Sequence, residues 1–81
     1  MWKRINMDND KEHFTYNRTW EQIEDMLDQA ERKQNQHYIK MQKTKSKKDR
    51  LHHMKNYKAL EGVIKALRWT LGDKNIKHPL E

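Results

Sequence analysis

Basic side chains are concentrated near the middle of this 81-residue chain, where six fall within eleven residues: Lys40, Lys43, Lys45, Lys47, Lys48 and Arg50. Ammonium and guanidinium groups bind phosphate, and so do the free amides at the start of a helix. A helix is predicted to begin at Ser46, which brings both kinds of donor together. The segment therefore indicates a surface for phosphate or nucleic acid, and its candidate residues are Lys43, Lys45, Ser46, Lys47, Lys48, Arg50 and Lys55.

Local helix stability explains only some of these charges. Lys40 and Lys43 lie near the predicted end of one helix, where the helix dipole favours positive charge. Lys45, Lys47 and Lys48 lie at the start of the next helix, where the dipole disfavours it. Two interpretations remain for these three lysines. They contact a polyanion backbone without base specificity, or they form a solvated turn that keeps the protein in solution.

Acidic residues dominate the segment before this basic one. Between Thr19 and Glu31 there are five acids and no Lys or Arg, whereas from Arg32 to Lys58 there are ten basic residues and one acid. Negative charge of this kind stabilises the N-terminal end of a helix. We therefore expect the acids to complement a helix dipole and to promote solubility.

The same acids suggest a different chemistry, and the set consists of Glu21, Glu24, Asp25 and Asp28. It resembles the carboxylate-lined helices of all-α nucleotide pyrophosphatases, in which acidic pairs on two helices hold Mg²⁺. Beyond the predicted cap residue Asp49, the second helix offers only Glu61, so one chain cannot complete an octahedral oxygen site. A metal-dependent enzyme that uses this acidic face is the outlying alternative.

Other catalytic and metal-binding chemistry has little support. His37, His52 and His53 fall near one level of the predicted fold, but adjacent helical residues point about 100° apart, so at most one of His52 and His53 can reach His37. The chain has no cysteine, its single serine is assigned to a cap, and its two glycines form no phosphate-cradling loop. We expect no enzyme activity, no metal and no cofactor.

Two amphipathic helices are needed to position these residues. The first begins with a capping box formed by Thr19 and Gln22. After it, residues spaced alternately by three and four positions form one stripe: Trp20, Ile23, Leu27, Ala30, Gln34, His37 and Met41. This spacing predicts a helix over about residues 19–43 that buries one narrow face.

The second helix is predicted over about residues 46–71. Ser46 and Asp49 resemble a capping box at its start, and Gly72 follows its last periodic residue. Its stripe consists of His53, Tyr57, Leu60, Ile64, Leu67 and Leu71, with Met54 and Val63 beside it. The short connection predicts an antiparallel, coiled-coil-like hairpin in which Leu27 faces Ile64 and His37 faces His53 or Met54.

A hairpin alone buries little surface, and only 33% of the residues are hydrophobic. The second helix carries further small or apolar residues away from its stripe, and these are the candidate interface residues Ala59, Gly62, Ala66 and Trp69. Either the irregular N-terminal arm over residues 1–18, with Trp2, Ile5 and Phe14, or a second hairpin must cover them. We expect dimerisation into a four-helix bundle.

Composition also limits the class of protein. The cysteine-free chain fits a reducing cytoplasm, and no segment predicts membrane insertion or secretion. The tail over residues 73–81 ends in Leu80-Glu81, which is typical of a vector-derived junction and is excluded from functional reasoning. In size, charge and lack of catalytic motifs the chain is similar to many accessory proteins of mobile elements.

The sequence as a whole predicts a small non-enzymatic helical protein that binds itself and either a protein partner or nucleic acid. The alternative is a nucleic-acid-binding protein that contacts phosphates through the basic turn. A DNA-binding helix-turn-helix motif is disfavoured. The helices of that motif are short and cross at a steep angle, whereas the two predicted helices are long and antiparallel.

Overall fold

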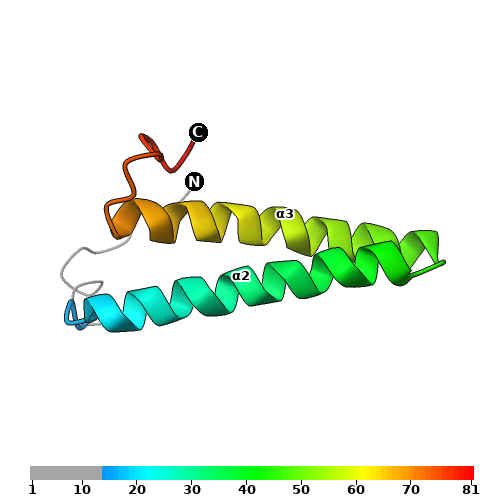
Figure 1. Ribbon diagram of the computed structural model, residues 1–81, viewed down its shortest axis with the longest axis horizontal. Helices are drawn as coiled ribbons and strands as arrows, with labels where there is room; N and C mark the ends of the chain where they lie inside the picture. Colours follow the sequence, from blue (N-terminus) through cyan, green and yellow to red (C-terminus); the bar gives the residue numbers. More distant parts are fainter. Residues whose placement is uncertain (1–13) are drawn as a thin grey trace, which may run out of the picture.

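The computed structural model describes residues 14–81, which contain two helices joined by the short turn 44–46 (Figure 1). Helix α2 spans Trp20–Lys43 and helix α3 spans Lys47–Thr70, and each is 24 residues long. The helices pack side by side in antiparallel orientation, and the described residues include no β-strand (Figure 1). The predicted all-α helical hairpin is therefore confirmed. The predicted contribution of Trp2 and Ile5 from the N-terminal arm lies outside the described residues.

Hydrogen bonds between near neighbours set the helix starts. The Thr19 hydroxyl accepts a bond from the Gln22 amide (3.1 Å), and the Gln22 side-chain oxygen accepts one from the Thr19 amide (2.9 Å), which is the predicted capping box. Ser46 caps α3 by accepting from the Asp49 amide (3.3 Å). The reciprocal bond from Asp49 is replaced, because the Ser46 amide donates to the Thr44 hydroxyl (3.2 Å). The hydroxyl of Thr44, a residue of the turn itself, therefore accepts the hydrogen bond that a capping box would give to Asp49.

The end of α3 depends on Gly72, which has a φ of 86°. The Gly72 amide donates to the Trp69 carbonyl (3.0 Å), and the Asp73 amide donates to the Arg68 carbonyl (2.9 Å). These two bonds form a Schellman motif, whose left-handed residue is glycine because a Cβ would be strained there. The motif redirects the chain, and residues 73–81 turn back over α3 at the end opposite the α2–α3 turn (Figure 1).

The core is a single narrow seam between the helices. In the part of the chain that the structure describes, only Ala30 and Ile64 are buried, with 6% and 9% of their surfaces exposed. Most other stripe residues are half-buried, as the spacing predicted, and they are Ile23, Leu27, Gln34, His37, Met41, His53, Tyr57, Leu60, Leu67 and Leu71.

The predicted stripe is wrong at one position and too broad at two. Trp20 remains 64% exposed, and Met54 and Val63 are 42% and 45% exposed. Trp20 is the first residue of α2 and lies at the open end of the hairpin. Met54 and Val63 lie on opposite flanks of α3, beyond the reach of α2.

None of the described helices has the length and apolar character needed to cross a membrane.

The capping box predicts a measurable contribution from Thr19. The Thr19→Ala variant should lower the free energy of unfolding by about 1 kcal/mol, because it leaves the Gln22 amide without its acceptor. Urea titration followed by circular dichroism measures this loss. Thr19→Ser keeps the hydroxyl and should stay close to the wild type. Equal losses in the two variants would contradict the assigned role of the hydroxyl.

Candidate functional site

The α2–α3 turn gathers six cations at one end of the hairpin. This basic tip consists of Lys40, Lys43, Lys45, Lys47, Lys48 and Arg50, and all six side chains are exposed. The Ser46 cap and the first amides of α3 lie among them. The structure thus brings together most of the residues predicted from the sequence, whereas Lys55 lies more than one helical turn farther along α3.

The cations of the basic tip differ from other cations of the hairpin in their partners. Arg50 donates to the Thr44 carbonyl (3.3 Å) and so helps to close the turn. Among residues 14–81, none of the six forms an ion pair. Away from the tip, Arg32 pairs with Asp28 (3.0 Å) and Lys58 with Glu61 (3.5 Å). Within the described part of the chain, six cations without an ion pair therefore lie close together at the turn, whereas toward the centre of the hairpin two cations are paired and Lys33 and Lys55 are not.

Three histidines lie just behind the basic tip. His37 and His53 meet across the seam with their Nδ1 atoms 3.0 Å apart, while His52 is exposed and its ring nitrogen lies 3.5 Å from the Asn56 side-chain amide. Partial burial of His37 and the nearby charges of His53 and Lys40 lower its pKa from the ordinary 6.5. His37 therefore favours the neutral form more strongly than a free histidine does.

Two tyrosines flank the same end of the seam. The rings of Tyr38 and Tyr57 pack on each other with centroids 6.0 Å apart. Tyr57 is half-buried and Tyr38 is 44% exposed. Both aromatic rings therefore serve packing between the helices, and Tyr38 alone presents much of its ring to solvent for stacking on a base.

The acids of α2 do not converge on one point. Asp25 accepts a hydrogen bond from Gln29 (2.7 Å), Asp28 pairs with Arg32, and Glu31 pairs with Arg68 of α3. Within the described residues, no group of three or more potential ligands is placed to hold a metal ion. The arrangement suits exposed pairing along a helix more than the shared binding of a cation.

One polar contact between the helices was not predicted from the sequence. The Arg68 guanidinium donates to Glu31 of α2 (2.6 Å) and to Asp73 of the tail (3.4 Å). The hydrogen bond to Glu31, followed by that to Asp73, raises the pKa of Arg68 above its ordinary value. In the sequence, Glu31 and Arg68 each directly follow a residue of the apolar stripe. This position beside the seam was the sequence signal that could have indicated the contact. The contact joins both helices to the returning tail.

The outward face of α3 remains uncovered over the predicted interface residues. Ala59, Gly62, Ala66 and Trp69 are all exposed, and Trp69 retains 51% of its surface. Apart from its two chain neighbours and the nearby backbone of α3 itself, no described atom lies within 4 Å of the position that a Cβ on Gly62 would occupy, so nothing in the hairpin itself requires a glycine there.

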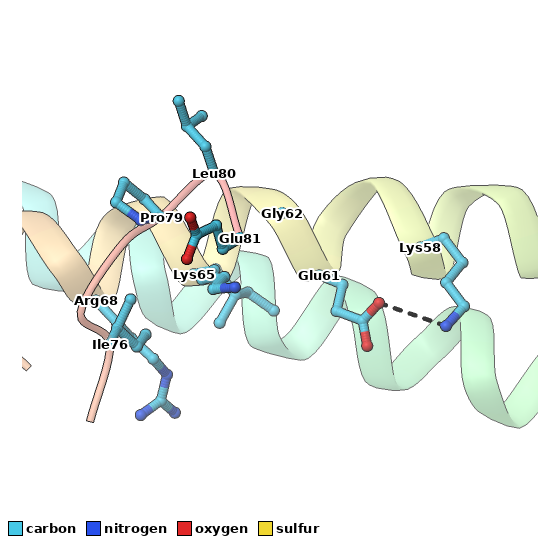
Figure 2. Close-up of a pocket in the computed structure, with 10 residues that line it drawn as sticks. Lys58, Glu61, Gly62, Lys65, Arg68, Ile76, Pro79, Leu80 and Glu81 are labelled. Atoms are coloured by element: carbon cyan, nitrogen blue, oxygen red, sulfur yellow. Dashed lines mark ion pairs between the residues drawn. The ribbon is translucent and has the colours of Figure 1, made fainter.

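The returning tail covers only one edge of this face. Figure 2 shows Ile76 and Pro79 of the tail beside α3, where an open depression of about 690 Å³ separates them from Lys58, Gly62 and Lys65. Leu80 and Glu81 form part of its wall. Because the depression is open to solvent, it is a weak candidate for a ligand site.

The described residues offer two surfaces for function, the basic tip and the outward face of α3. The first consists of exposed cations beside the amides that begin α3, and the second consists of small residues and Trp69. The chain matches no protein-family model, no curated protein and no solved structure.

The contact of Arg68 with Glu31 predicts a stabilising role for this ion pair. Both side chains are only 42% exposed, so Arg68→Gln should lower the free energy of unfolding by about 0.5–1 kcal/mol in urea titrations at low salt. Arg32→Gln breaks a more exposed pair within α2 and serves as the control, with an expected loss of about 0.3 kcal/mol. A larger loss for Arg32→Gln would contradict this interpretation.

Proposed function

We propose that the chain is a small non-enzymatic helical protein that acts by binding other macromolecules and that pairs with a second copy to form a four-helix bundle. The observation that carries this proposal is the size of the core. Within residues 14–81 two residues are buried, while eleven large hydrophobic side chains remain exposed. A chain of this length needs more burial to offset the entropy of folding. A second hairpin supplies that burial.

The outward face of α3 is the surface assigned to the partner copy. Ala59, Gly62 and Ala66 are small, so the axis of another helix can approach closely. Trp69 lies farther along the same face and provides a large apolar contact. A two-fold dimer uses the same patch on both chains, which a face of this kind allows. Nothing within one hairpin requires a glycine at position 62, whereas close contact with a second helix does.

Sedimentation equilibrium tests the dimer. We expect the mass of two chains at micromolar concentrations, and Ala66→Glu should shift the protein to monomer because it places a charge in the contact. Asn35→Glu introduces the same charge at an exposed position of α2 and should leave the dimer intact. Circular dichroism checks that each variant is helical. A folded wild-type monomer at all concentrations, or equal effects of both variants, would refute the proposal.

A second candidate function is nucleic-acid binding through the basic tip. It is supported by the six exposed cations that have no ion pair within the described residues, next to the free amides that begin α3. A phosphate backbone supplies the missing negative charge. Five of the six cations of the tip are lysines, which contact phosphates as point charges, so we expect this binding to be independent of sequence.

Salt-dependent binding to random DNA and RNA tests this candidate. Replacing Lys45, Lys47 and Lys48 with alanine should weaken binding to DNA and reduce the salt slope by about 0.9 for each phosphate that is no longer neutralised. The matched control replaces Lys65, Lys74 and Lys77, which removes the same net charge away from the tip. Equal effects of the two triple variants would indicate general charge attraction, and absence of binding at low salt would exclude the candidate.

The metal-dependent enzyme has less support. Asp25, Asp28 and Glu31 of α2 engage neighbouring side chains, and α3 contributes only Asp49 and Glu61. We place the binding function in the cytoplasm, because a cysteine-free sequence fits a reducing compartment.

A further inference from the structure

The contact between His37 and His53 has a strict requirement for protons. Their Nδ1 atoms lie 3.0 Å apart, one on each helix. A hydrogen bond at this distance needs one Nδ1–H group and one lone pair, so one of the two imidazoles must be neutral. When both rings are protonated, two donors and two positive charges face each other. The hydrogen bond can therefore form when both rings are neutral or when one ring is protonated, but not when both rings are protonated.

The surroundings make the doubly protonated state costly. Lys33 and Lys40 of α2 and His52 of α3 all act on His37 with charge of the same sign. On α3, Asp49 lies one turn before His53, but it is exposed, and no carboxylate of residues 14–81 forms an ion pair with any of the three imidazoles. The second proton consequently enters a region where the cations are uncompensated.

We propose that the His37–His53 contact is a proton-sensitive latch, which holds the tip end of the hairpin closed at neutral pH and releases it in mildly acidic solution. The latch joins the helices where the seam is least apolar, between Gln34 and Met41 on α2. Its opening separates two imidazolium groups and exposes them beside the basic tip. The inference depends on neither of the two proposed functions, because it concerns the free hairpin.

The direction of the pH effect follows from linkage. His37 has a lowered pKa in the folded chain, so the open state binds protons more readily than the closed state. The contribution of the latch to stability is fully present above the ordinary histidine pKa of about 6.5. It is lost progressively as the pH falls below that value.

Nuclear magnetic resonance of the full chain tests the latch. Ring-proton titrations should give His37 a pKa below 6.5. Protection factors of amides near the tip should fall between pH 7.5 and 5 relative to those near Ile23 and Leu67. The expected change is at most about tenfold for each unit by which the pKa is lowered.

Two variants separate the latch from a general effect of acid. His53→Gln should move the pKa of His37 toward its ordinary value and flatten the pH dependence at the tip. His78→Gln alters a histidine of the tail and should change neither quantity. A wild-type His37 that titrates at or above 6.5 would refute the proposal, as would an unchanged pH response in His53→Gln. If His53→Gln does not fold, the wild-type titration alone decides.

Discussion

The narrow seam between α2 and α3 is the interaction on which the rest of the structure depends. Within the described residues it contains the two buried side chains, Ala30 and Ile64. The spacing of alternately three and four residues fixes which face of each helix is buried, and therefore which side chains are left to solvent. Because the seam is one residue wide on each helix, whole faces of α2 and α3 remain uncovered. The outward face of α3, one of the two candidate surfaces, is left exposed because the seam is narrow.

Stability and charge are distributed unequally along the seam. Near the open end of the hairpin it contains Ile23, Leu27 and Leu67, and the contact between Arg68 and Glu31 adds a link between the helices. Toward the turn, Gln34 and the histidines replace aliphatic residues. The basic tip lies at this more polar end, where apolar burial contributes least to holding the helices together. Repulsion among the cations therefore acts where the packing offers the least resistance.

Much of the hairpin was predictable because it depends on short-range rules. The Thr19 cap and the Gly72 turn involve bonds between residues three to five positions apart, so their sequence signatures are local. The register of His37 against His53 follows from the two stripes and a short turn. Rules of this kind need only the order of residues along the chain.

The features that escaped prediction depend on three-dimensional arrangement. Glu31 and Arg68 are 37 positions apart, and their contact requires the rotation of both helices to be known. The exposure of Trp20, the first residue of α2, depends on how the ends of the two helices are placed relative to each other. The same contrast between local rules and three-dimensional arrangement applies to the candidate site. The sequence places the lysines at the turn, but only the structure distinguishes Arg32 and Lys58, which are paired, from the cations of the tip.

The basic tip and the histidine pair form one electrostatic system. An anion bound near Lys45 and Lys47 would offset the positive potential around the His37 and His53 rings, and so would raise the lowered pKa of His37. By reciprocity, protonation of these rings would strengthen the binding of that anion by the same factor. If the tip binds an anion and the His37–His53 contact opens on protonation, as proposed above, then proton uptake, opening of the tip and anion affinity are coupled.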